Sequence, residues 1–92
     1  MARIYQTNNM GEAHFRVNLS DRSTADLLVH RVSSRGLALG DARWYITRDK
    51  QDADIWLYFT SLGMAQLKVC FVDNYGEAGW QHSHPLQGRL GR

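Results

Sequence analysis

The stretch Asp54-Ile55-Trp56-Leu57-Tyr58-Phe59-Thr60 decides the fold, because it is hydrophobic on both faces of an extended chain. Successive side chains of a β-strand point to opposite faces, so every second residue from Ile55 to Phe59 shares one face. Trp56 and Tyr58 share the other. Strands with two apolar faces are typical of buried positions inside a sheet. We therefore expect a central strand here, with other parts of the chain covering it on both sides.

Shorter β-like stretches flank this strand. Residues 66–72 (QLKVCFV) are a second candidate for burial on both faces. Residues 14–19 alternate, which predicts Phe15, Val17 and Leu19 on one inward face. If that strand lies at a sheet edge, it could pair with a second copy of the chain.

The remaining segments complete a mainly β pattern. Strands are predicted at residues 3–7, 25–32 and 43–48, separated by polar or glycine-containing turns. Residues 37–40 fit either one helical turn or an irregular crossing. No window keeps a 3.6-residue apolar stripe for three turns. The prediction is a small, mainly β single domain of short strands, with one short helix at most.

One unit of sequence recurs along the chain. The segment from Arg3 to Phe15 (RIYQTNNMGEAHF) aligns without gaps with the segment from Lys68 to Trp80 (KVCFVDNYGEAGW). Residues 44–55 (WYITRDKQDADI) align with residues 4–15 in the same way. A shorter echo occurs at residues 24–27, and residues 26–38 resemble residues 54–65 with one residue missing. The unit reads strand, turn, acid-alanine, strand, and it predicts internal strand-turn repeats.

The acids of this unit are Glu12, Asp52 and Glu77. A carboxylate after a turn can accept hydrogen bonds from unpaired turn N–H groups, and the alanine beside it leaves room for a second segment to cross. The alternative is that the three carboxylates gather into a catalytic or metal-binding cluster. Acids in equivalent turns would be spread around the fold, which favours the capping role.

Composition places the chain among single-domain globular proteins. It has 92 residues, of which 43% are hydrophobic and 22% charged. The net charge of +2 comes from Arg89 and Arg92, because residues 1–81 hold nine Lys or Arg and nine Asp or Glu. A neutral body lacks the broad basic field that nucleic-acid binding needs, unless folding segregates the charges. No apolar segment follows Met1, so no secretory leader is expected, and no run is long enough to span a membrane.

Few residues suggest chemistry. The single cysteine, Cys70, lies among apolar residues and is expected to be a small buried hydrophobe rather than a nucleophile, in keeping with a reducing, cytoplasmic setting. Residues 82–92 read as a C-terminal tail after a domain of residues 1–81. In that tail, His82 and His84 would share one side of an extended segment and could bind zinc, but further ligands do not stand at a recognised spacing. We expect no metal, no cofactor and no catalytic residue.

Aromatic residues are numerous, and some adjoin basic ones. Arg43, Trp44, Tyr45 and Arg48 have the composition of a surface on which nucleic-acid bases stack. The alternative is that these large side chains build the core, which a short β domain needs. Arg43, Trp44, Tyr45 and Arg48 are therefore the candidate nucleic-acid-binding residues, although the core role is favoured.

The chain resembles the septoil-knot domains, a family of small bacterial domains of unknown function. The resemblance is carried by three segments that together span nearly all of residues 1–81: RIYQTNNMGEAHFRV, DARWYITRDKQDADIWLYF and GMAQLKVCFVDNYGEAGWQ, at residues 3–17, 41–59 and 63–81. It implies a backbone knotted with seven crossings, slow folding and slow unfolding, and no activity. Such knots are nearly absent from proteins, but a regular winding of the chain agrees with a recurring strand-turn unit.

The sequence does not define an activity. The leading hypothesis is a non-enzymatic, compact structural or interaction module, whose partner is an unidentified protein or a second copy of the chain. The second is a nucleic-acid-binding module that uses aromatic and basic surface residues. The third is a small enzyme that uses the turn carboxylates, which would then have to meet in one cleft.

Overall fold

The computed structural model describes residues 2–90. The expectations for Met1 and for Arg92, at the end of the tail, lie outside the described residues. Within them the structure has short strands and three-residue 3-10 helices only. The strands are β1 (Ala2–Gln6), β2 (Phe15–Leu19), β3 (Leu27–Arg31), β4 (Arg43–Thr47), β5 (Ile55–Phe59), β6 (Leu67–Phe71) and β7 (Gly79–Trp80).

The 3-10 helices lie in the connections between strands. They are η1 (Met10–Glu12), η2 (Arg35–Leu37), η3 (Lys50–Asp52), η4 (Leu62–Met64) and η5 (Tyr75–Glu77). The ambiguous residues 37–40 therefore hold the end of a 3-10 turn and an irregular crossing. Across residues 2–90, no helix has the length and apolar character that crossing a membrane requires.

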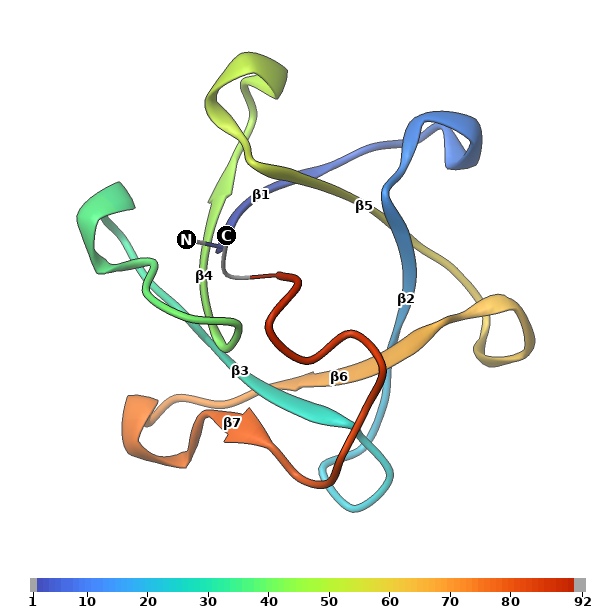
Figure 1. Ribbon diagram of the computed structural model, residues 1–92, viewed down its shortest axis with the longest axis vertical. Helices are drawn as coiled ribbons and strands as arrows, with labels where there is room; N and C mark the ends of the chain where they lie inside the picture. The colour runs from blue at the N-terminus through green and yellow to red at the C-terminus, as the bar shows by residue number, and fades with distance from the viewer. Residues whose placement is uncertain (1, 91–92) are drawn as a thin grey trace.

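Six of the strands form a closed ring. Their order is β4-β1-β5-β2-β6-β3, all pairs are parallel, and β3 pairs in turn with β4, which closes the ring (Figure 1). The last strand, β7, adds to the outside of this order as an antiparallel partner of β3. Closure removes the edges of a sheet. Because β2 lies between β5 and β6, it offers no free edge for pairing with a second copy.

The chain passes around the ring twice. The first round lays down β1, β2 and β3, and in the second round β4, β5 and β6 take the places between them (Figure 1). Most cross-strand partners are consequently about 40 to 50 residues apart in the sequence, as Ala2 and Trp44 or Phe15 and Leu57 are. The connections project outward as lobes at the corners of the ring.

The turn of each unit is capped by a different residue from the one predicted. The side chains of Asn9, Asp49 and Asn74 accept hydrogen bonds from the backbone N–H two residues further on, in η1, η3 and η5 respectively. This is the role expected of Glu12, Asp52 and Glu77, so that prediction is wrong. An Asn or Asp side chain is short enough to bond the backbone N–H two residues after it, which is the geometry of this turn.

The core fills the inside of the ring. It is built by side chains at alternate strand positions, and the fully buried ones include Ile4, Val17, Leu27, Val29, Trp44, Leu57, Leu67 and Val69. In β5, Ile55 and Leu57 point inward and are buried, but Trp56 and Tyr58 are only half-buried on the outside. The predicted second covering layer is therefore absent over β5, because the protruding lobes cover its outer face only in part.

Two further burial predictions need correction. Leu19 at the end of β2 is 56% exposed, because it lies beyond the inner residues Phe15 and Val17, at the rim of the ring. Cys70 points outward from β6 and is half-buried, not enclosed.

The segment predicted as a solvated tail is packed against the core. Residues 82–90 cross one end of the ring (Figure 1), and the side chains of Leu86 and Leu90 join the core cluster. Asp41 fixes this segment: its carboxylate accepts from the backbone N–H of Gly88 at 2.5 Å and of Leu90 at 3.1 Å. The sequence prediction was based on the low apolar content of the whole segment and gave no weight to its two leucines, which are four residues apart.

Candidate nucleic-acid and protein interface

The outer faces of the six ring strands carry a set of side chains that we name the outer belt. We define it by one pair of facing residues from each two neighbouring strands. These pairs are Arg3 with Tyr45, Tyr5 with Trp56, Arg16 with Tyr58, Asn18 with Lys68, Leu28 with Cys70, and His30 with Arg43.

The belt combines cations with aromatic rings and contains no carboxylate. All nine Asp and Glu residues of the chain lie in the connections, whereas none lies in a strand. Folding therefore segregates the charges in part. Five of the ten Lys and Arg residues among residues 2–90 lie in strands, whereas the other five lie in the connections, where three of them pair with acids. One belt cation is neutralised directly, since Arg3 forms a salt bridge of 2.9 Å with Asp54.

The four predicted nucleic-acid-binding residues do not form one surface. Trp44 points into the ring with no exposed surface, and its indole N–H donates to the backbone oxygen of Asp41 at 2.6 Å. A fully buried indole cannot stack on a base, so Trp44 is a core residue. Arg43 and Tyr45 do point outward in the belt, and Arg48 is exposed just after β4.

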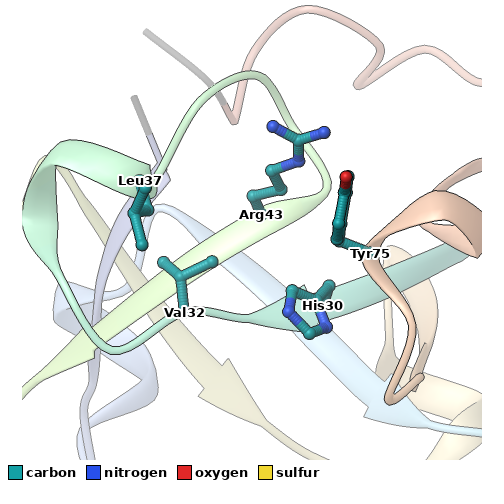
Figure 2. A pocket seen from close by; sticks show the side chains of 5 residues that line it. All are labelled: His30, Val32, Leu37, Arg43 and Tyr75. Carbon is teal, nitrogen blue, oxygen red and sulfur yellow. The ribbon is translucent and has the colours of Figure 1, made fainter.

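A pocket opens beside Arg43, at the seam where β3 meets β4. It has a volume of about 320 Å³, and its lining is His30, Val32, Leu37, Arg43 and Tyr75 (Figure 2). Leu37 and Tyr75 come from two different lobes, η2 and η5, which flank the seam. Tyr75 is 61% exposed, an unusual position for a large aromatic ring in a polar turn.

The polar side chains of this seam pocket are held in place by neighbours. The guanidinium of Arg43 lies 4.9 Å from the centroid of the Tyr75 ring, in a cation–π contact. His30 approaches Tyr75 with a ring-centroid distance of 6.2 Å, and its Nδ1 lies 3.2 Å from the carbonyl oxygen of Val72. The sequence prediction missed both His30 and Tyr75. Tyr75 aligns with Met10 in the recurring unit, at a turn position. This alignment could have predicted that Tyr75 is exposed.

A second cluster on the belt, which we name the Lys50 cluster, has the same plan with the chemical roles exchanged. There the facing pair is Tyr5 and Trp56, and Lys50 from lobe η3 extends over both rings at 5.7 Å and 5.3 Å. In this cluster the cation also has an internal carboxylate, because Lys50 Nζ lies 3.2 Å from Glu12. The charge of Lys50 is thus matched within the chain.

Glu12 is the acid with the most distinctive surroundings. The Thr7 hydroxyl donates a hydrogen bond to its carboxylate, and Lys50 donates a second. The hydroxyl, first, and the lysine, second, hold the pKa of Glu12 below its ordinary value of 4.5. Asp52 and Glu77 instead pair with Arg35 and Arg22 on other lobes, so the three carboxylates do not meet in one cleft.

The lowered pKa of Glu12 predicts a specific pH dependence. A carboxyl whose pKa is lower in the folded state than in the unfolded state stabilises the fold above its unfolded pKa, and this contribution is lost as the pH falls through the folded value. Glu12→Gln should therefore flatten the decline in unfolding free energy below about pH 4.5. Urea unfolding at a series of pH values measures this.

Glu77→Gln is the matched control for that variant. Glu77 occupies the same place in η5, but Val72 stands where Thr7 stands in the first unit, so there is no hydroxyl donor. The flattening should be smaller in this variant, because it removes only an exposed ion pair with Arg22 and no hydrogen bond from a hydroxyl. An equal flattening in both variants would show that the Thr7 hydroxyl adds nothing to the acid sensitivity that Glu12 confers.

The histidines of the C-terminal segment meet a carboxylate of the barrel. His82 Nε2 lies 2.8 Å from one oxygen of Asp26, and His84 Nε2 lies 3.6 Å from the other. Asp26 is buried and also accepts from the backbone N–H of Lys68 at 2.9 Å. These contacts hold the C-terminal segment against the ring. In the part of the chain that the structure describes, no group of three or more His, Cys, Asp or Glu is arranged to hold a metal ion.

The closed ring of parallel strands, around which the chain passes twice, makes this a small, mainly β domain. Residues 1–81 match the family whose description is "7(1) septoil knot domain", so the chain belongs to that family and the resemblance of its sequence is confirmed. No curated protein and no solved structure matches the chain. Residues 82–90, which cross the end of the ring, lie outside the matched residues.

Proposed function

We propose that the domain is a non-enzymatic interaction module that binds a short acidic segment of another protein through the outer belt. The observation that carries this proposal is the absence of any carboxylate from a belt that contains Arg3, Arg16, Arg43 and Lys68. Cations beside aromatic rings favour partners that combine acids with apolar side chains.

The shape of the molecule favours a peptide over a nucleic acid. The belt is interrupted by lobes, and these carry acids such as Glu12, Asp52 and Glu77. A continuous phosphate backbone would have to pass these acids, which repel it, whereas a short peptide can place its acids between them. Nucleic acid remains the second candidate, because facing pairs such as Arg16 and Tyr58 offer both charge and a stacking surface.

A cytoplasmic location and a non-enzymatic role are both part of this proposal. We place the module in the cytoplasm, where Cys70, half-buried and without a second cysteine in the chain, stays reduced. An enzymatic role has no support from the turn carboxylates, since each of them pairs with a separate cation.

Fluorescence anisotropy tests the proposal. The probes are a labelled peptide of alternating acidic and apolar residues, its neutral Gln and Asn counterpart, and a single-stranded oligonucleotide, each at about 50 mM and about 300 mM salt. The acidic peptide should bind, more weakly at the higher salt, and the neutral one should not. Arg16→Gln with Lys68→Gln should weaken binding by about tenfold, since about 1.4 kcal/mol corresponds to that factor.

The control is the double variant Arg48→Gln with Arg89→Gln. It removes the same charge from two exposed cations that lie outside the belt. If both double variants weaken the peptide equally, net charge and not the belt causes binding, and the proposal is wrong. If the oligonucleotide binds more tightly than the peptide and its binding depends on the belt, the ligand of the belt is a nucleic acid and not a peptide.

A further inference from the structure

The seam pocket lacks a carboxylate like the one that pairs with the cation of the Lys50 cluster. In both places a side chain from the start of a 3-10 turn lies over a facing pair of strand residues: Lys50 over Tyr5 and Trp56, and Tyr75 over His30 and Arg43. In the Lys50 cluster, the cation of this arrangement is matched by Glu12. In the pocket, Arg43 forms no salt bridge with any carboxylate of residues 2–90.

The reason for this difference lies in the winding. Elsewhere around the ring, consecutive strands are separated by a strand of the other round, but β3 and β4 are consecutive and are direct neighbours. Their connection forms lobe η2, and the lobe η5 that follows β6 flanks the same seam. The pocket lies between these two lobes (Figure 2), because Leu37 of η2 and Tyr75 of η5 both line it.

We infer that the seam pocket binds a carboxylate attached to an apolar or aromatic body. This inference rests on the proposed function and specifies the chemical group that binds at the belt residues His30 and Arg43. A guanidinium stacked on an aromatic ring keeps its N–H edge free, and that edge matches a carboxylate with two parallel hydrogen bonds. Arg43 is held in this way by Tyr75.

The rest of the lining fits the body of such a ligand. Val32 and Leu37 line the opposite side of the pocket from Tyr75 (Figure 2), so an apolar group attached to the carboxylate would lie between aliphatic and aromatic surfaces. The exposed area of Leu37, at 54%, would be reduced by this contact. A volume of about 320 Å³ is at the small end of the range for ligand pockets, which suits a single aromatic carboxylate or one terminal residue of a peptide.

Two sources could supply this chemistry: a free small molecule, or the C-terminal carboxylate of a polypeptide. Titration followed by amide NMR distinguishes them with four probes. These are 3-phenylpropionate, its neutral amide, a tetrapeptide ending in Leu-Phe with a free carboxylate, and the same peptide amidated. Both carboxylates should shift the resonances of Arg43 and Tyr75, and the tighter one identifies the source. Neither amide should bind.

Arg43→Gln should weaken the carboxylate probes at least tenfold, a loss of about 1.4 kcal/mol. Tyr75→Leu, which removes the stacking partner but keeps an apolar side chain, should weaken them less. Lys50→Gln is the matched control, because it removes a cation that also lies over aromatic rings but outside the seam pocket, and it should leave their binding unchanged. Folding of each variant is checked in the same spectra.

The possible outcomes separate this inference from the proposed function. Amides that bind as well as the carboxylates, binding that survives Arg43→Gln, or no binding at millimolar probe would each overturn the carboxylate pocket. If the acidic peptide still binds in a belt-dependent way, only the pocket is refuted. If that peptide fails while the carboxylates bind at Arg43, the belt is refuted and the pocket stands as a small-molecule site.

Discussion

Leu90→Ala is expected to lower the free energy of unfolding by about 2–5 kcal/mol, the usual cost of replacing a fully buried leucine by alanine. Leu90 has no exposed surface, and it lies in the core cluster although it stands near the end of the chain. Its backbone N–H is held by the carboxylate of Asp41, which limits how far the segment can shift to fill the space left by the side chain. The cavity should therefore persist.

Leu62→Ala provides the comparison, because Leu62 lies in lobe η4 and is 61% exposed. Its replacement should change stability by less than about 0.5 kcal/mol, as is usual for surface positions. Equilibrium unfolding in guanidinium, followed by circular dichroism after long incubation, measures both. Equal and small effects would mean that residues 82–90 do not pack on the ring in solution.

The strands could be predicted from sequence, and the reason is local. β-Branched and aromatic residues in alternating or continuous runs, separated by glycine, asparagine and aspartate, place each of the six ring strands within a few residues of its observed bounds, whereas the two-residue strand β7 was not predicted. The closure of the ring could not be predicted, because it depends on partners about 40 to 50 residues apart, such as Ile4 and Ile55. Local sequence carries little information about which strands of a repeated unit become neighbours.

The same limit explains the outer belt and the seam pocket. Arg43 and Tyr45 were recognised as candidates because they adjoin Trp44 in sequence, yet the neighbours that matter come from other strands and lobes. Arg43 faces His30 across β3 and β4, and Tyr75 comes from a turn more than thirty residues away. Sequence adjacency grouped a core tryptophan with surface residues, whereas period-2 alternation already separates Trp44 from Arg43 and Tyr45.

Trp44→Ala is expected to cost about 3–5 kcal/mol, the range for removal of a large buried aromatic side chain. Trp44 is the largest fully buried side chain, packs edge-on against Phe71 at a centroid distance of 6.0 Å, and donates from its indole to the backbone oxygen of Asp41. A domain of this length has a total stability of roughly 5–14 kcal/mol, so the variant should be strongly destabilised at room temperature.

Two comparison variants show that the cost arises from burial. Trp56→Ala removes the same side chain from the half-buried outer face of β5 and should cost clearly less. Trp44→Phe keeps an aromatic ring but removes the hydrogen bond from the indole to Asp41, which should cost about 0.5–1.5 kcal/mol. Because Trp44→Phe leaves the outer belt intact, it should bind the acidic peptide like the unchanged protein. A loss of peptide or oligonucleotide binding in this folded variant would show that Trp44 belongs to the binding interface. Equal losses of stability in Trp44→Ala and Trp56→Ala would contradict the inward orientation of the Trp44 side chain.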